Sequence, residues 1–437
     1  MKNLGLALSG GGSRAAAFHS GTLTALSDLG LLDRIDVISS VSGGSLFGAA
    51  WMASRIEGQA NAVFVERMQQ ELTRGFITRS IRPSLLLALC PGVGYSRTHL
   101  LADTFDQVFF RNLTLGTLPD HPALCINTTL LNNGQVGKFD RNGFSAWHVA
   151  GGGEGPSHIV PWRDFPLAQA VAASAAFPVG LPPLTLPLKD FPEGTTFSGP
   201  LEGARAIYLT DGGVLENLGI QTLLKSHRYA TWDLIVSDAG VNIPPWYGSG
   251  FLGSLRGLLV WLLCGRTLDR LMLVMNDKQN RWARKEAYDQ LVLSWLADAV
   301  QRGDVGEQEA RAIEKCLGYE RRARRRMLLF ARIAQDWNSF FRSIPAWRLF
   351  ELANNASISP ITIPSDTSVN AIIEHLERMG CDLEVAKEWY GRAGSESGVR
   401  RIKEVETNFT ALPRDTVTRL AAHAAWQVHA AHAVYTH

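Results

Sequence analysis

The chain has 437 residues, of which 46% are hydrophobic and 19% are charged, and its formal net charge is +2. This length allows one large domain with additions or two domains, and the apolar content is sufficient for a sizeable core. Because nucleic-acid-binding domains carry a strong basic excess, the near balance of charge argues against a nucleic-acid partner.

Cysteine usage and hydropathy bear on the compartment. The five cysteines are scattered, and none has a spacing to Cys or His that indicates zinc. The chain has no uncharged apolar run of 18 residues and no signal-peptide pattern after Lys2. We therefore expect a cytoplasmic protein with no metal and no cofactor, at most peripheral at the inner face of a membrane.

Strand and helix patterns alternate in the first half of the chain. The predicted strands are Leu4–Leu8, Ile35–Ser39, Ala123–Leu131, Ala206–Asp211 and Asp233–Asp238; the predicted helices are Arg14–Leu29 and Leu46–Ile56; the predicted loops are Gly151–Pro156 and Pro178–Gly199. This alternation is typical of a parallel sheet covered by helices on both faces.

The second half of the chain becomes rich in Arg, Leu, Trp and Ala from about Pro244. Its predicted elements are amphipathic helices over Asn280–Val300 and Asp415–Val434 and a late strand over Ser357–Ile363. We expect a core over residues 1–245 and a mainly helical region over residues 246–437 that packs on the core and adds the late strand.

Three glycines, Gly10, Gly11 and Gly12, separate the first strand from the first helix. Glycines there allow a tight turn whose N–H groups point outward, and at a helix N-terminus such groups attract negative charge. The charge is either a bound pyrophosphate or an oxyanion that forms in a transition state.

The pyrophosphate interpretation rests on Gly10, Gly12 and Ala15, which match G-x-G-x-x-A. That fingerprint also needs an acidic residue at the end of the second strand, whereas Asp33 and Asp36 precede its apolar part. The glycines alone leave the pyrophosphate site, the oxyanion hole and a plain tight turn open.

Ser42 lies in Ser-Val-Ser-Gly-Gly, between a predicted strand and a predicted helix. The nucleophile elbow, G-x-S-x-G, needs small residues two positions before and after its serine, and Ser40 and Gly44 stand there. The pattern indicates either a catalytic serine or a glycine-rich turn.

Asp211 ends another predicted strand and precedes Gly212 and Gly213. A carboxylate at the carboxyl end of a strand lies where ligands bind in open α/β sheets, and it can accept a proton from a serine hydroxyl. The alternative is an Asp-Gly turn whose side chain bonds its own backbone.

The order of these three motifs resembles the patatin-like phospholipases over roughly residues 3–245. The resemblance implies a mixed, largely parallel α/β sheet flanked by helices, with a mainly helical C-terminal extension. It also implies a Ser–Asp dyad without histidine, in which Ser42 is the nucleophile and Asp211 its base. Gly10, Gly11 and Gly12 would supply the N–H groups of the oxyanion hole.

Further residues match the family's motifs. Arg14 matches the arginine of G-G-G-x-R, Asn217 matches the asparagine after the aspartate, and Ser174 and Pro178 match a supporting Ser/Pro block. The expected supporting residues are Ser13, Arg14, Ser40, Gly44, Gly212, Gly213 and Asn217. The sequence departs from the family's pattern at Ser40 and Ala15, where glycine is usual, and at "LENLGI".

The implied activity is hydrolysis of phospholipids or other lipid esters through an acyl-serine, of the phospholipase A or lysophospholipase type. Two alternatives remain open at this point. One is a nucleotide-binding α/β protein that uses the glycine loop, and the other is a non-catalytic lipid-binding member of the fold.

Histidines and apolar or basic segments complete the predictions. We expect His19 to pack against the sheet, and His423, His429 and His432 to lie on a surface helix. Three segments are candidates for lipid contact, although each also suits a core or a solvated helix: Phe251–Arg266, Arg321–Arg326 and Arg82–Tyr95.

Overall fold

The computed structural model describes residues 3–76, 96–151, 159–178, 180–225, 229, 232–240, 265–303, 305–317, 328–356, 358, 367–394, 402, 405 and 408–436. The predicted segments Arg82–Tyr95 and Arg321–Arg326 lie outside these residues, as does nearly all of Phe251–Arg266, Ser357–Ile363 and Gly151–Pro156. Within the described part of the chain, no helix has both the length and the apolar character needed to cross a bilayer.

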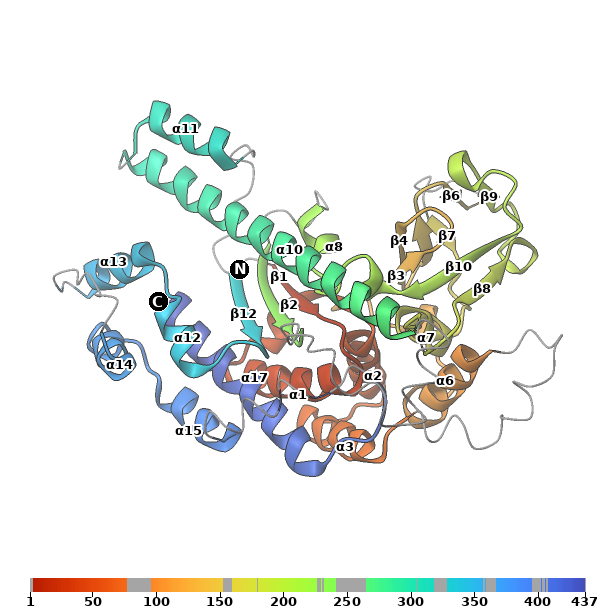
Figure 1. Cartoon of the computed structure of the whole chain (residues 1–437), viewed down its shortest axis with the longest axis horizontal. Helices are drawn as coiled ribbons and strands as arrows, with labels where there is room; N and C mark the ends of the chain where they lie inside the picture. Colours follow the sequence, from red (N-terminus) through yellow and green to blue (C-terminus); the bar gives the residue numbers. More distant parts are fainter. Residues whose placement is uncertain are drawn as a thin grey trace.

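Five parallel strands form the centre of the sheet (Figure 1). In spatial order they are β12 (Leu328–Arg332), β11 (Asp233–Asp238), β1 (Leu4–Leu8), β2 (Ile35–Val41) and β3 (Ala123–Leu130). Four of the five coincide closely with predicted strands, because each is a short apolar run buried on both faces.

An antiparallel lobe continues the sheet beyond β3 and lies at the upper right of Figure 1. Its strands are β4 (Gln135–Asp140), β5 (Gly143–Ala146), β6 (Val149–Ala150), β7 (Ile159–Pro161), β8 (Leu184–Pro187), β9 (Thr196–Phe197) and β10 (Ala206–Asp211). The mixed, largely parallel sheet is thus confirmed. The loop predicted over Pro178–Gly199 is wrong, since it holds β8 and β9, which are too short to show an alternating pattern.

Helices cover the sheet and extend from it. The α-helices are α1 (Gly12–Asp28), α2 (Gly43–Ile56), α3 (Asn61–Arg74), α6 (Arg97–Phe105), α7 (Leu167–Ser174), α8 (Gln221–Lys225), α10 (Gly265–Arg302), α11 (Glu307–Leu317), α12 (Trp337–Arg342), α13 (Ala346–Asn355), α14 (Val369–Arg378), α15 (Glu384–Ala393) and α17 (Arg414–Tyr435). Short helical turns are η1 (Leu32–Arg34), η2 (Asp106–Phe110), η3 (Leu115–Thr117), η4 (Leu188–Asp190), η5 (Gly199–Leu201) and η6 (Gly212–Val214).

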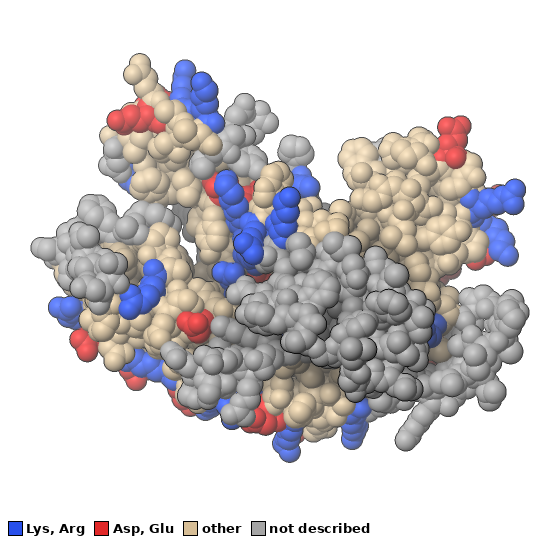
Figure 2. Space-filling view, viewed as in Figure 1, with Lys and Arg blue, Asp and Glu red and all other residues tan. Residues whose placement is uncertain are grey.

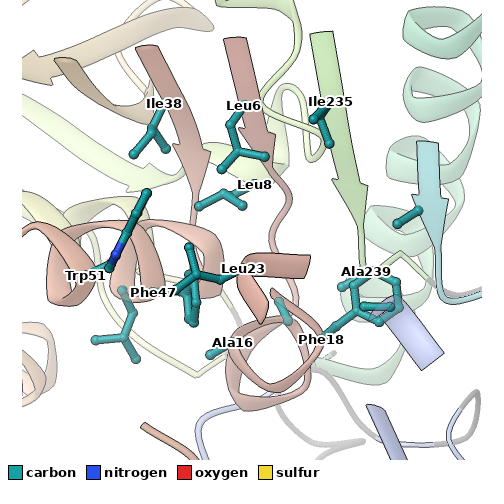
Figure 3. Packing of buried hydrophobic residues seen from close by; sticks show 14 of the residues in the cluster. Leu6, Leu8, Ala16, Phe18, Leu23, Ile38, Phe47, Trp51, Ile235 and Ala239 are labelled. Carbon is teal, nitrogen blue, oxygen red and sulfur yellow. The ribbon is translucent and has the colours of Figure 1, made fainter. Parts of the chain in front are cut away.

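Two apolar cores lie on opposite faces of the parallel strands. On one face Leu6 and Leu8 of β1 pack with Phe18 of α1 and Phe47 of α2 (Figure 3). On the other face Ala7 of the same strand belongs to a cluster with residues of α8 and α10. Alternate residues of one strand therefore face different helical layers, and the sheet is covered on both sides as predicted.

The C-terminal helix α17 is part of the larger core. It packs along α1, and a Cβ atom on Gly21 would lie 1.8 Å from the Ala421 carbonyl oxygen. His423 is fully buried and His429 is 7% exposed, so the prediction of a surface helix is wrong. The alanines of α17 leave room for close helix contact, and His423 and His429 are buried with them, whereas His432 is half-buried.

The late strand at the sheet edge is β12, which pairs in parallel with β11. It comes from the apolar run after Arg326, where the sequence analysis predicted no strand, whereas the predicted strand Ser357–Ile363 lies almost wholly outside the described residues. A short apolar run suits a buried strand as well as a buried helix, so periodicity alone does not separate the two. The boundary near residue 245 stays a prediction.

Charged side chains are unevenly spread on the face shown in Figure 2. Lys and Arg side chains gather over the middle of α10, whereas both signs of charge mix along the lower edge. In its described part the same helix exposes four large apolar side chains, Met275, Trp282, Tyr288 and Trp295.

Candidate active site

Ser42 stands at a strained turn between β2 and α2. Its φ of 53° and ψ of −119° lie outside the usual regions for a residue with a side chain. Gly44 is tightly enclosed, because a Cβ there would lie 2.3 Å from the Leu8 carbonyl oxygen. Ser40 fits in place of the usual glycine since its hydroxyl donates to the Cys125 carbonyl of β3, at 3.0 Å. The elbow geometry predicted from the sequence is therefore present.

Ser42 and Asp211 are in direct contact, although 169 residues separate them. The Ser42 hydroxyl donates to Asp211 Oδ2 at 2.7 Å, and both residues are only 4% exposed. The second carboxylate oxygen accepts the Gly213 N–H at 2.7 Å. Both acceptor oxygens are thus oriented, one by the backbone of the turn and one by the serine.

The strand arrangement that places Asp211 beside Ser42 differs from the prediction. Asp211 ends β10, which runs antiparallel to β3, with Asp211 opposite Thr128. Val41 of β2 pairs with Asn127 on the other side of β3. The register on the two sides of β3 brings the side chains of Ser42 and Asp211 to the same level of the sheet. The position of Asp211 therefore does not follow from the rule that ligands bind at the carboxyl ends of parallel strands.

Burial governs the protonation of Asp211. Desolvation raises the pKa of this carboxyl from 3.8 to about 6, while the hydrogen bonds from Ser42 and Gly213 lower it. The group is therefore ionised at neutral pH, with a much higher proton affinity than an ordinary carboxylate. That is the condition under which a carboxylate acts as a general base near pH 7.

A polar network behind the elbow holds the Ser42 backbone. The Ser42 N–H donates to Ser174 Oγ at 2.9 Å, and the Ser174 hydroxyl donates to the Asn127 carbonyl at 2.6 Å. The Asn127 side-chain N–H group donates to Ser39 Oγ and to the Ser40 carbonyl, each at 3.0 Å. Ser174 was predicted, whereas Asn127 was missed; the sequence signal of Asn127 is an amide directly after the apolar run of residues 123–126. Pro178, predicted with Ser174, is exposed.

The three glycines of the loop after β1 have different environments. The Gly10 N–H donates to the Asn217 carbonyl at 2.9 Å, so that donor is already used. Gly11 and Gly12 have φ values of +139° and +58°, and their N–H groups have no hydrogen-bond partner among the described residues. Of the predicted oxyanion donors, these two have N–H groups that remain open to a ligand.

The glycine loop touches the elbow at Gly43, the residue after Ser42. A Cβ atom on Gly43 would lie 2.2 Å from the Gly12 carbonyl oxygen and 2.8 Å from the Gly12 nitrogen. The Gly43 N–H likewise has no hydrogen-bond partner in the described part of the chain. The sequence analysis did not single out Gly43, although the residue after an elbow nucleophile commonly donates to the oxyanion.

The turn after Asp211 connects this residue to the glycine loop. A Cβ atom on Gly10 would lie 2.3 Å from Asn217 Oδ1 and 3.1 Å from the Ser42 Cβ, and one on Gly212 would lie 2.5 Å from the Asn127 carbonyl oxygen. Neither glycine could carry a side chain without moving the site.

Glu216 fixes the end of the same turn. Its carboxylate accepts the Leu218 N–H at 2.5 Å and the Gln221 N–H at 3.2 Å, at the start of α8. Burial raises the pKa of this carboxyl to about 7, against the effect of these hydrogen bonds. Glu216 was not predicted, and an acidic residue before a helix is its only sequence signal.

Arg14 and Ser13 brace the glycine loop from behind. Arg14 is 3% exposed and donates from Nε to the Ala239 carbonyl at 3.2 Å and from Nη1 to the Val405 carbonyl at 2.6 Å. Burial lowers the pKa of its guanidinium to about 10, while Asp238 nearby raises it. The Ser13 N–H donates to the Asn408 carbonyl at 2.7 Å. Both residues are thus engaged with backbone carbonyls, as suits supporting residues.

His19 lies against the sheet, as expected. Its ring nitrogens contact Ser237 Oγ at 2.7 Å and the Ser9 carbonyl at 2.9 Å, and burial lowers its pKa to about 4. The residues that the structure describes include no group of three His, Cys, Asp or Glu side chains placed to hold a metal ion.

Comparison with known proteins decides the family. The model of the patatin-like phospholipase family matches residues 6–224, which is half of the chain. The chain belongs to the patatin-like phospholipase family. The match contains every motif of the site described above, from the glycine loop to the turn after Asp211. None of the curated proteins matches the chain.

Solved structures offer more distant likenesses to this patatin-like chain. Human GIVD cytosolic phospholipase A2 is similar with 12% identity and a TM-score of 0.39, over 56% of this chain and 50% of that chain. VipD from Legionella pneumophila gives 15% identity and a TM-score of 0.31, over 56% and 51%. The ExoU–SpcU complex of Pseudomonas aeruginosa gives 15% and 0.26, over 97% and 76%. The chain spans about half the length of the first two, and likeness at these TM-scores carries no weight beside the family match.

Proposed function

We propose that this patatin-like chain is a lipid acyl hydrolase that cleaves carboxylic esters on a Ser42–Asp211 dyad. The observation that carries the proposal is the 2.7 Å hydrogen bond between the two side chains, at a strained elbow that touches a glycine loop. In the first step Asp211 takes the hydroxyl proton as Ser42 Oγ attacks the ester carbonyl carbon. The proton then passes to the departing alcohol, and an acyl-serine remains.

Water completes the reaction by attacking the acyl-serine. Asp211 takes a proton from the water, the fatty acid leaves, and the Ser42 hydroxyl is restored. Each step passes through a tetrahedral oxyanion, for which the N–H groups of Gly11, Gly12 and Gly43 are the proposed donors. Removal of one such donor typically lowers kcat by about 100- to 1,000-fold.

The substrate class we propose is phospholipids or related lipid esters, of the phospholipase A or lysophospholipase type. The family's description as phospholipases supports this choice. The nucleotide-binding alternative is disfavoured by the N-terminus of α1. There the Ser13 N–H already bonds the Asn408 carbonyl, which stands against Gly12 where a pyrophosphate would sit.

We also propose peripheral contact with a lipid surface, because a lipid hydrolase must reach its substrate. Trp282 is 74% exposed and Met275 is 52% exposed on α10, where basic side chains gather (Figure 2). Helix α10 packs against η6, the turn directly after Asp211. Exposed aromatic and basic residues on one helix favour an anionic bilayer surface.

A fluorophosphonate probe tests the dyad directly, since it phosphonylates activated serines. We expect the wild type to be labelled at Ser42, with no labelling of Ser42→Ala and at least 100-fold slower labelling of Asp211→Asn. Ser145→Ala, which removes a half-buried hydroxyl of β5, serves as the matched control and should label like the wild type. Absence of labelling in the folded wild type would favour the non-catalytic lipid-binding member of the fold.

A further inference from the structure

A segment near the C-terminus crosses the glycine loop. It comprises residues 408–412, which we call the strap, and it lies far beyond the residues that match the family model. The Ser13 N–H donates to the Asn408 carbonyl at 2.7 Å, and the Ser13 hydroxyl donates to the Thr410 carbonyl at 3.0 Å. The carbonyls of Asn408 and Thr410 are thus both bonded to Ser13, in the first turn of α1.

The strap fixes the position of Gly12 by contact. A Cβ atom on Gly12 would lie 2.0 Å from the Asn408 carbonyl oxygen, and one on Gly43 would lie 2.2 Å from the Gly12 carbonyl oxygen. Gly12 is therefore enclosed between the strap on one side and the elbow on the other. Its φ of +58° is held by backbone groups on both sides.

The strap is itself anchored on the far side, to the end of α3. The Phe76 N–H donates to the Phe409 carbonyl at 2.9 Å, and the Leu412 N–H donates to the Leu72 carbonyl at 3.0 Å. Phe409 is 4% exposed, and its ring meets the Phe105 ring edge to face at 5.6 Å. These contacts tie the strap to the core, so that it does not depend on the glycine loop for its own position.

The Asn408 side chain shapes the bend that aims its carbonyl at α1. Its Oδ1 accepts the Thr410 N–H at 3.1 Å and the Thr410 hydroxyl at 2.5 Å. This is an Asx turn, which sets the local backbone through an acceptor at the γ-position. An aspartate would preserve that acceptor, whereas an alanine would remove it.

We propose that Asn408 is a positioning residue for the reaction, which acts by holding Gly11 and Gly12 where their N–H groups meet the oxyanion. This inference rests on the proposed function. The strap also accepts the hydrogen bond of the Ser13 N–H. Of the N–H groups at the start of α1, those of Gly11 and Gly12 are then left to donate to a ligand. The C-terminal half of the chain would then complete the active site without contributing a reacting group.

The test compares Asn408→Ala, Asn408→Asp and Thr410→Val in the full chain, with Asp382→Ala as the control. The control removes a similar bond, from the Glu384 N–H to Asp382 Oδ1, at the start of α15. With a nitrophenyl ester, we expect Asn408→Ala to lower kcat by about 10- to 100-fold with KM within about twofold of the wild type. Asn408→Asp should restore most of kcat, and Asp382→Ala should change neither constant.

Amide hydrogen exchange over residues 9–18 gives a second readout that does not need activity. Exchange at Ser13, whose N–H bonds the Asn408 carbonyl, should be faster in Asn408→Ala and Thr410→Val than in the wild type and Asp382→Ala. If the wild type has no esterase activity yet this difference is present, the proposed function fails while the strap still holds the loop. If both variants keep wild-type kcat and wild-type exchange, the inference is overturned. Thr410→Val decides the question if Asn408→Ala does not fold.

Discussion

The carboxyl group of Asp211 is buried without a positive partner among the contacts that determine its pKa, which burial raises to about 6. As the base of the proposed reaction it must be ionised. We therefore expect kcat/KM to rise with pH through a single ionisation near pH 6 and to be flat from about pH 7 to 8. A pH profile with a nitrophenyl ester checks this, and a midpoint near pH 4 would contradict the buried-base account.

The same raised pKa predicts a cost in stability. The folded state holds this proton more tightly than the unfolded state, whose pKa is near 3.8, so its contribution favours folding at low pH and is lost as pH rises through 6. At pH 8, Asp211→Asn should raise the free energy of unfolding by about 2–3 kcal/mol, and by less at pH 5. Urea denaturation at both pH values measures this, and equal effects at the two would count against it.

Ser42 adds backbone strain to that cost. Its φ of 53° with ψ of −119° is a conformation that glycine adopts more readily than any residue with a Cβ. We expect Ser42→Gly to be more stable than Ser42→Ala by about 1–2 kcal/mol, with both inactive. Thermal unfolding of the pair measures the difference; equal melting temperatures would mean that the elbow is not strained.

At the scale of elements, the packing of α2 against β1 sets the position of Ser42, the proposed nucleophile. A Cβ atom on Gly44 would lie 2.3 Å from a β1 carbonyl oxygen, so Gly44→Ala must move the helix or the strand. We expect a loss of at least 2 kcal/mol in stability and of most activity. Gly391→Ala on α15, where nothing lies within 4 Å, is the control and should be neutral or slightly stabilising. Similar behaviour of the two variants would contradict the packing argument.

The site residues differ in how far the sequence predicts them. Ser42, Asp211 and the glycines stand at strand ends in characteristic local patterns, so their neighbours in sequence identify them. The bonds of Ser13 to Asn408 and of Gly10 to Asn217 use backbone carbonyls, which every residue possesses. Such contacts do not restrict the type of residue that supplies the carbonyl. They require at most a glycine on the facing segment, and a glycine in the sequence does not indicate which segment it faces.

The strands also differ in how far the sequence predicts them. Four of the five central parallel strands are short, largely apolar runs and were predicted to within two residues at each end, whereas β6 and β9 have only two residues each and carry no pattern. Strand β12 was not predicted, because a short apolar run beside arginines fits a strand and a helix equally well. The register that sets Asp211 opposite Thr128 depends on pairing across β3, which the sequence does not show.

At the scale of the whole molecule, the C-terminal half supplies an edge strand, a core helix and the strap. Removing it would expose the β11 edge, the α1 face at Gly21 and the glycine loop. We therefore expect a fragment of residues 1–245 to lack a cooperative thermal transition and to aggregate. The full chain measured by the same circular dichroism melt is the control, and a soluble fragment with a cooperative melt would show two independent domains.

The most direct test of the central claim is fatty acid release from phospholipid vesicles, measured by mass spectrometry. The wild type, Ser42→Ala and Asp211→Asn are compared at equal concentration, after each is shown to be folded. Our account predicts free fatty acid and lysophospholipid with the wild type, and no more than the enzyme-free background with either variant. Release by Ser42→Ala at the wild-type rate, or no release from any lipid ester by the folded wild type, would contradict it.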